Sequence, residues 1–265
     1  MRAIKVDLPR NLEFVEVHAI SDVHLGSSHC DFKAIYNRVQ EIAGNPNAYV
    51  VLNGDLINNS TKTSLGDVYS ETITPMEQLK QAVALFKPIK DKILAITSGN
   101  HEGRTYKADG IDLMELMAIE LGIGNRYAKE SATVFLRVGE MPPYKKATGK
   151  TDVARQICYV IFATHGAGGG RVEGSKINRL VHLANIVDAD IYIHSHTHLP
   201  AALKQSFYRT DTRNSTIAEV DKLFVNTNAW LRYGGYGEAL GYKPASISPP
   251  VIYLSGKRKE FRVNL

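Results

Sequence analysis

The sequence predicts a layered α/β protein that forms one domain from residue 1 to residue 265. Short apolar runs, each ending in a polar turn, alternate along the chain with amphipathic segments that carry helix caps. Strands that alternate with helices are typical of layered α/β folds. No internal repeat or low-complexity tract interrupts this order, which favours one domain over an array of small units.

The predicted strands share one pattern, an apolar run that is followed directly by Gly, Asn, Asp, Ser, Thr or His. Short apolar runs bounded by such residues indicate buried strands. The five runs are residues 14–20, 49–52, 93–97, 159–163 and 191–193.

Four segments between these strands carry helix signals. Asp31 is placed to cap a helix that has apolar residues every three or four positions and a stop signal at Gly44. Residues 74–77, Thr-Pro-Met-Glu, have the pattern of a capping box with Pro at the first helical position. Two further helices are predicted over residues 112–121 and 175–187.

Two remaining segments complete the predicted fold. The tail, residues 249–265, is predicted to form a closing hairpin that turns at Ser255-Gly256. Residues 139–155 are polar and basic and contain a Pro-Pro pair, which predicts a surface loop between two strands.

Composition excludes several classes of protein. Hydrophobic residues make up 44% of the chain and charged residues 22%, and the formal net charge is +5, which is compatible with an anionic substrate. No apolar run reaches the length of about 18 residues that a membrane span needs, and residues 1–10 do not resemble a signal peptide. Cys30 and Cys158 stand alone, so we expect neither a disulfide framework nor a thiolate zinc site, and we expect a cytoplasmic protein.

Metal-ligand side chains follow the predicted strands. In chain order they are Asp22, His24, Asp55, Asn100, His101, His165, His196 and His198. The carboxyl ends of strands in open α/β sheets are where binding sites form, so these side chains are expected to converge. Since residues i and i+2 of a strand point the same way, Asp22 and His24 are expected to share one ion, and His196 and His198 have the same spacing.

The ligand types predict a site for two divalent ions. Carboxylate, imidazole and amide oxygen suit manganese, which we expect, with iron, zinc and nickel as alternatives. Two such ions about 3.5–4 Å apart activate water for phosphoryl chemistry, and a carboxylate must bridge them. Asp55 is the natural candidate for the bridge.

Five sequence blocks, in order, resemble the calcineurin-like metallophosphoesterase family: Asp22-Val23-His24, Gly54-Asp55, Gly99-Asn100-His101-Glu102, His165-Gly166 and His196-Thr197-His198. The resemblance implies two mixed sheets packed face to face and flanked by helices, a four-layer αββα sandwich. It implies one ion held by Asp22, His24, Asp55 and His198, and a second held by Asp55, Asn100, His165 and His196. It also implies that His101 contacts the phosphate and stabilises or protonates the leaving oxygen.

Three positions depart from the family pattern. Ser195 replaces the glycine that precedes the last His-x-His, and the turn is expected to survive because serine is small. Asn58 stands where the phosphatases carry the acid that orients the catalytic histidine, and Asn59 replaces their arginine. Asn58 can accept a hydrogen bond from His101 but cannot stabilise an imidazolium as a carboxylate does, so we disfavour protein phosphatase activity.

Substrate contacts are expected from a glycine-rich loop that follows His165 and from Arg104. In the loop, Gly169 and Gly170 would offer backbone N–H groups to phosphate oxygens, and Arg171 would clamp them. A plain tight connection is an equally good interpretation of the loop. A rival register of the last block would use His194 with His196, but residue 194 should still lie in the strand.

The resemblance is greatest to the compact phosphodiesterase and DNA-repair-nuclease-like members that occur in phages and bacteria. We therefore expect a dinuclear hydrolase of phosphodiester bonds, acting on nucleic acid or a nucleotide, in which water between the two ions attacks phosphorus. One alternative is a phosphomonoesterase acting on a small nucleotide. The other is a protein-binding scaffold of the same fold, which would have no need for His101.

Overall fold

The fold is described from a computed structural model of the 265-residue chain. The structure describes residues 1–62, 64, 68–143, 153–168, 170, 172–239 and 241–265.

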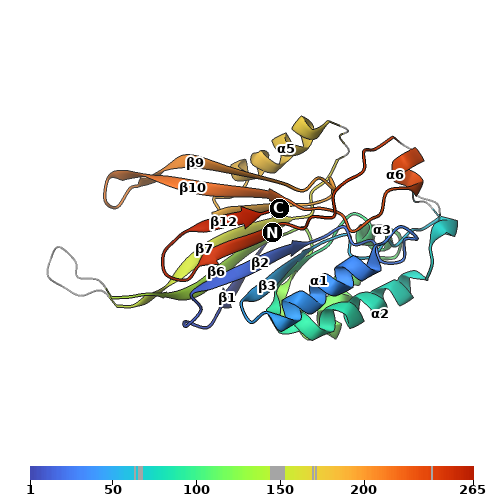
Figure 1. Cartoon of the computed structure of the whole chain (residues 1–265), viewed down its shortest axis with the longest axis horizontal. Coiled ribbons are helices and arrows are strands. Elements are labelled where there is room, and N and C mark those ends of the chain that lie inside the picture. The colour runs from blue at the N-terminus through green and yellow to red at the C-terminus, as the bar shows by residue number, and fades with distance from the viewer. Residues whose placement is uncertain (63, 65–67, 144–152, 169, 171, 240) are drawn as a thin grey trace.

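Two mixed six-stranded sheets form the centre of the molecule (Figure 1). The first sheet has the strand order β1-β6-β7-β8-β10-β9 and the second has the order β12-β11-β2-β3-β4-β5. The strands are β1 (Arg2–Asp7), β2 (Phe14–Ile20), β3 (Ala48–Asn53), β4 (Ile93–Thr97), β5 (Tyr127–Ala128), β6 (Ser131–Met141), β7 (Arg155–Thr164), β8 (Ile191–His194), β9 (Ala201–Asp211), β10 (Thr216–Asn226), β11 (Val251–Ser255) and β12 (Phe261–Asn264).

Helices cover the outer faces of both sheets. The α-helices are α1 (Phe32–Gly44), α2 (Pro75–Phe86), α3 (Glu102–Asp109), α4 (Leu113–Glu120), α5 (Glu173–His182) and α6 (Gly235–Ala239), of which α1, α2, α4 and α5 pack on the sheets. Within the described ranges, four short 3-10 helices lie at Val68–Ser70, Lys87–Lys92, Gly124–Arg126 and Leu183–Asn185.

Three apolar clusters separate the four layers. The central cluster lies between the sheets and includes Val17 and Val51 from one sheet and Val134 and Ile161 from the other. A second cluster packs α1, α2 and α4 against the outer face of the second sheet, and a third packs α5 against the first sheet. The expected αββα sandwich is therefore confirmed.

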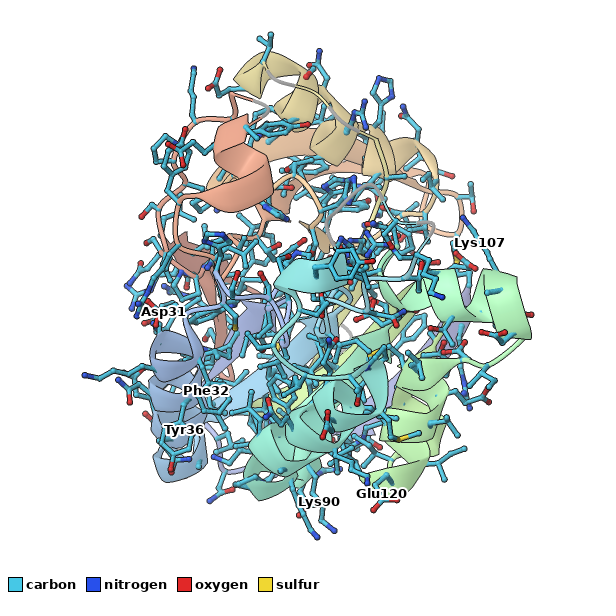
Figure 2. The ribbon with its side chains drawn as sticks, turned by 90° about the vertical axis from the view of Figure 1, so that its right-hand side faces the viewer. Asp31, Phe32, Tyr36, Lys90, Lys107 and Glu120 are labelled. Atoms are coloured by element: carbon cyan, nitrogen blue, oxygen red, sulfur yellow. The ribbon has the colours of Figure 1, made fainter. Side chains whose placement is uncertain are left out.

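The topology brings the strand ends of both sheets to one end of the molecule. Strands β2, β3 and β4 run parallel in the second sheet, and β7 and β8 run parallel in the first. The side chain of Asn53, at the end of β3, donates to the Thr164 carbonyl at the end of β7 at 2.8 Å. Figure 2 looks at this end of the molecule, with Asp31, Phe32 and Tyr36 along α1 on one side and Lys107 on the other.

Local sequence signals predicted several elements. Asp31 caps α1 by accepting a hydrogen bond from Ala34 N at 3.1 Å, and Thr74 and Glu77 form the expected capping box of α2. The tail forms the predicted hairpin of β11 and β12. The helix predicted over 175–187 begins earlier, at Glu173, and its last turn is a 3-10 helix.

Other expectations need correction. The predicted loop 139–155 overlaps the ends of β6 and β7, and its residues 144–152 lie outside the described part of the chain. Strands β1, β9 and β10 and helix α3 were not predicted. Among the described residues, no helix has the length and apolar character needed to cross a membrane.

Candidate metal centre

The predicted ligands lie in the loops that follow β2, β3, β4, β7 and β8, and five of them have unusual backbone conformations. The residues are Asp22 and His24 (both φ 51°), Asp55 (φ 50°), His196 (φ 67°) and His198 (φ 56°). Only two other described non-glycine residues, Asn59 and Ser215, have positive φ. Left-handed backbone is uncommon for residues other than glycine, although Asp and His adopt it more often than most, and it clusters at functional sites where the surrounding structure imposes it.

One group of ligand atoms comes from Asp22, His24 and His198. The three atoms lie within 4.8 Å of one another. Asp22 Oδ1 is 3.2 Å from His198 Nε2, and the His24 and His198 rings meet edge to face with centroids 5.5 Å apart. Asp22 and His24 thus converge because both adopt left-handed backbone after β2 has ended, and not by strand alternation as expected.

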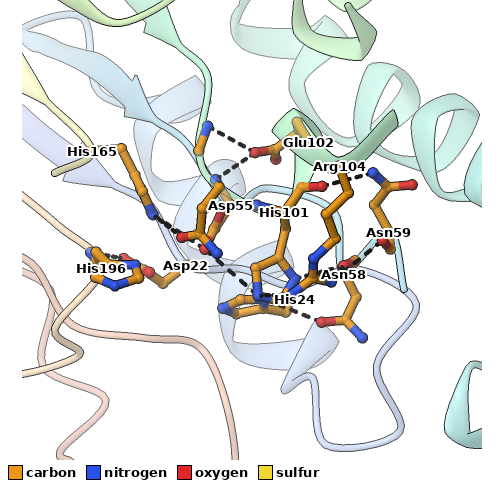
Figure 3. A network of polar contacts seen from close by, with 12 residues as sticks. Asp22, His24, Asp55, Asn58, Asn59, His101, Glu102, Arg104, His165 and His196 are labelled. Atoms are coloured by element: carbon orange, nitrogen blue, oxygen red, sulfur yellow. Dashed lines mark hydrogen bonds and ion pairs between the residues drawn. The ribbon is translucent and has the colours of Figure 1, made fainter. Parts of the chain in front are cut away.

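A second group comes from Asp55, His165 and His196, whose ligand atoms also lie within 4.8 Å of one another. Asp55 Oδ2 is 3.1 Å from His165 Nε2 (Figure 3). Asn100 Oδ1 is 3.2 Å from the same nitrogen. His165 Nδ1 faces the Asn53 carbonyl at 2.8 Å, so it carries the proton and directs Nε2 into the group. His196 and His198 therefore belong to different groups, although equal strand spacing suggested a shared one.

Unpartnered buried atoms show that the first group fits a metal ion. His24 Nε2 is buried and makes no hydrogen bond to any residue within the described ranges, and the buried Asp22 Oδ1 has His198 Nε2 as its neighbour at 3.2 Å. Buried polar atoms are nearly always paired, so a buried imidazole nitrogen without a partner, close to a carboxylate and a second imidazole, fits a cation. Oxygen and imidazole donors without thiolate suit first-row divalent metals.

Charge at the site is shared between carboxylates and histidines. Burial by itself would raise the pKa of the Asp22 carboxyl, but His198 and His165 hold that pKa below its ordinary value. For Asp55 burial acts in the same direction, and His165 and His101 keep the pKa well below the usual range. Both carboxylates are therefore ionised and available at neutral pH.

The histidines divide into two kinds. Burial would lower the pKa of His165, but Asp55 outweighs burial and raises this pKa to about 10. Burial lowers the pKa of His196 to about 4 and that of His24 well below its ordinary value. His24 and His196 are thus neutral candidate ligands near pH 7, whereas His165 would have to lose a proton before it could bind a metal.

Both ring nitrogens of His101 already have partners. Nδ1 lies 2.6 Å from the Asn58 carbonyl, which can only accept, and Arg104 Nη2 donates to Nε2 at 3.0 Å. Arg104 also donates to the Asn58 carbonyl at 3.1 Å. The Nε2 atom is 3.9 Å from Asp55 Oδ2, so His101 lies beside the ligands, and its hydrogen bonds hold it as a neutral ring at their edge.

The side chain of Asn58 does not support His101 as expected. Its Oδ1 lies 3.2 Å from His24 Nδ1, and only its backbone carbonyl contacts His101. Asn59, in the position of the phosphatase arginine, donates to the His101 carbonyl at 2.7 Å and accepts from Thr105. Neither residue therefore places a charge at the site.

Glu102 has a role that the sequence analysis did not assign. Its buried carboxylate accepts four backbone N–H groups, from Asp55 at 3.0 Å, Leu56 at 2.7 Å, Ile57 at 3.2 Å and Gly99 at 2.8 Å. Burial, and then the charge of Asp55, raise the pKa of Glu102 to about 7, while the N–H donors favour the ionised form. Glu102 thus joins the Asp55 loop to the Asn100 loop.

Ser195 gives the site a hydrogen bond that a glycine could not make. Its buried hydroxyl lies 2.6 Å from Asn53 Nδ2. His194, the member of the rival register, lies in β8 with Nδ1 2.8 Å from Asn226 Oδ1, outside both ligand groups.

The predicted substrate contacts are only partly described. Gly169 and Arg171 lie outside the described residues. A Cβ atom on Gly170 would lie 2.4 Å from Ser175 Oγ, so the backbone packs closely against the start of α5. Lys176 on α5 donates to the Thr197 carbonyl at 2.9 Å, which fastens the helix to the His196–His198 loop.

A family model described as calcineurin-like phosphoesterase matches residues 16–200, and no curated protein sequence matches the chain. Among solved structures, a predicted phosphoesterase from Streptococcus pneumoniae is 13% identical with a TM-score of 0.40, covering 94% of this chain and 88% of that one. A single mutant of Vps29 from Entamoeba histolytica is 12% identical with a TM-score of 0.43, covering 94% and 90%. The calcineurin-like phosphoesterase YfkN from Bacillus subtilis is 13% identical with a TM-score of 0.38, covering 95% and 90%.

The matched segment extends over more than half of the chain and contains all the residues of both ligand groups. The protein therefore belongs to the calcineurin-like phosphoesterase family.

Proposed function

We propose that this protein hydrolyses phosphodiester bonds with the help of two divalent metal ions, with manganese as the expected metal and a nucleic acid or nucleotide as the substrate. The observation that supports this most strongly is the pair of ligand groups. Asp22, His24 and His198 form one, and Asp55, His165 and His196 form the other. Asp55 also forms a third group with His24 and His101, whose ligand atoms lie within 4.8 Å of one another. This arrangement supports Asp55 as a bridge between two ions.

Two bound divalent ions would lower the pKa of a water molecule and neutralise phosphate oxygens. The protein's own residues orient the reaction. Glu102 fixes the Asp55 loop by accepting a hydrogen bond from the Asp55 backbone N–H. His101 lies at the edge of the site, within reach of a phosphate bound there. Because Nδ1 of His101 is committed to the Asn58 carbonyl, Nε2 is the atom that faces the substrate side, with Arg104 as its donor.

The preference for diesters rests on how little fixed positive charge the site carries. A monoester dianion gains more from added cations than a diester monoanion does. Asn59 is neutral where the phosphatases place an arginine, and its side chain is engaged in structural hydrogen bonds. One specific observation favours the second candidate, a phosphomonoesterase: the Arg104 guanidinium lies beside His101 and would attract a dianion.

A substrate comparison separates the candidates. The initial rates on bis-p-nitrophenyl phosphate and p-nitrophenyl phosphate, with manganese added, should give a higher kcat/KM for the diester. Asp55→Asn serves as the control for contaminating hydrolases. Cyclic nucleotides and single-stranded DNA, tested alongside, narrow the substrate class.

A clear preference for the monoester would overturn the diester proposal and put the phosphomonoesterase first. Bound metal without turnover of any of these substrates would favour a binding scaffold.

A further inference from the structure

A chain of polar side chains lies behind His24, on the side away from the other ligands. His24 Nδ1 is 3.2 Å from Asn58 Oδ1, and the Asn58 amide nitrogen donates to Glu71 Oε1. The other carboxylate oxygen of Glu71 accepts from the side-chain amide of Gln78. Figure 3 shows the first link, between Asn58 and His24.

The direction of every hydrogen bond in this chain is fixed by Glu71. A carboxylate can only accept, so Asn58 must turn its NH₂ toward Glu71 and its oxygen toward His24. The proton of His24 then resides on Nδ1, and the lone pair resides on Nε2. That Nε2 atom is the buried one that lacks a hydrogen-bond partner among the described residues.

Glu71 is held in place by a docked segment of backbone. Ser27 and Glu71 form an antiparallel bridge, and Thr72 N donates to the Gly26 carbonyl at 2.9 Å. Gln78 is fully buried, and its carbonyl accepts from Asn59 N at 2.8 Å. Gly26 has φ 99°, and a Cβ atom there would lie 2.2 Å from Gln78 Nε2, so this packing requires glycine.

We propose that Glu71 is a positioning residue for the metal ligand His24, acting through Asn58. Glu71 supplies the carboxylate that position 58 lacks, with the Asn58 amide between this carboxylate and His24. In this way Glu71 fixes both the ring orientation and the tautomer of His24. Carboxylates behind metal-binding histidines orient the ring and raise its basicity, and their removal costs about 10–100-fold in metal affinity. The inference rests on the metal-binding role of His24 proposed above.

An exchange of the two side chains tests this directly. In Glu71→Gln, the new NH₂ must face one of two donors, from Asn58 or Gln78, and in Asn58→Asp two carboxylates face each other. In the double variant N58D/E71Q, the new carboxylate at position 58 would accept from His24 and from the new amide at position 71, whose oxygen would accept from Gln78. The double variant thus keeps one negative charge and every hydrogen bond that links His24, position 58, position 71 and Gln78.

The first readout is manganese affinity and stoichiometry by titration calorimetry. We expect each single variant to weaken one of the two ions by about 10–100-fold and the double variant to recover most of that loss. The matched control is Glu77→Gln, which removes the same charge from the exposed capping box of α2, where glutamine also serves, and should leave affinity unchanged.

The second readout is the His24 tautomer in metal-free protein, from ¹H–¹⁵N correlation of the histidine rings, with the signal assigned by its loss in His24→Gln. The wild type and the double variant should show a protonated Nδ1, and Glu71→Gln should lose this uniform state.

Single variants that match the wild type in both readouts would overturn the inference and leave the proposed function standing. Loss of affinity that the double variant does not recover would also overturn it, since a merely structural role gives that result. A wild-type protein that binds no metal would instead refute the proposed function, and the tautomer measurement would still decide whether Glu71 orients His24.

Discussion

Asn53 links the two sheets directly beneath the candidate site, and its replacement gives a quantitative test of the structure. The side chain is fully buried at the end of β3. Its NH₂ group donates to the Thr164 carbonyl at 2.8 Å and lies 2.6 Å from Ser195 Oγ, and its oxygen accepts from Thr97 Oγ1 at 2.8 Å. Asn53→Ala removes all three hydrogen bonds and leaves buried partners behind.

The expected magnitude follows from that count. A buried hydrogen bond contributes about 0.5–1.5 kcal/mol net, so three of them predict a loss of about 3 kcal/mol in the free energy of unfolding. Ser195→Ala removes one of the three and should cost about 1 kcal/mol. Because the two changes share one hydrogen bond, the double variant should be more stable than additivity predicts, by about 1 kcal/mol.

Urea denaturation of the metal-free protein, with a chelator present, measures these values. Asn185→Ala is the matched control, because this exposed asparagine lies on the 3-10 helix after α5, and the change should stay within about 0.5 kcal/mol. A cost below about 1 kcal/mol for Asn53→Ala, or strict additivity with Ser195→Ala, would refute the reasoning.

Three further predictions concern the metal centre. Asp55→Asn should weaken binding of both ions, because it removes the negative charge of the bridge. His101→Ala should retain both ions and lower turnover by about 10² or more. Metal analysis and kcat distinguish the two variants, and loss of both ions in His101→Ala would contradict the role of His101. Because the pKa of His165 is about 10, a metal ion that binds His165 displaces a proton. The apparent affinity for that ion should therefore rise about tenfold per pH unit between about pH 7 and 9. Asp22 and His24 in the other group carry no proton at these pH values and release none. Calorimetry in buffers of different ionisation enthalpy counts the protons, and equal pH dependence at both sites would contradict this. Gly99→Ala would place a Cβ atom 2.1 Å from Asp55 Oδ1, so we expect it to lower metal affinity severely, and unchanged manganese binding would show that the loop tolerates the shift.

The elements that local chemistry defines were predictable. The caps of α1 and α2 are formed by short-range hydrogen bonds, and apolar runs such as residues 93–97 are buried along their whole length. The distal half of the β9–β10 hairpin is exposed on both faces, so it carries no apolar alternation to detect. Helix α3 is polar and its only buried residue is Glu102, which hides its helical pattern.

The candidate site likewise has features that the sequence predicts and features that it does not. The ligand types and their order along the chain were visible in the sequence, but the left-handed backbone of Asp22 or His198 was not, since neither residue type predicts it. Spacing alone suggested that His196 and His198 would act together, and the turn between them separates them. Glu71 belongs to no motif, and it reaches Asn58 only because its segment docks onto Gly26 and Ser27.

The most direct test of the two-ion site is a crystal structure of the protein grown with manganese, with anomalous data collected at the manganese edge. We expect two anomalous peaks about 3.5–4 Å apart, one contacting Asp22, His24 and His198, the other contacting His165 and His196, with Asp55 between them. A single peak at full occupancy, or two ions that do not share Asp55, would contradict this expectation.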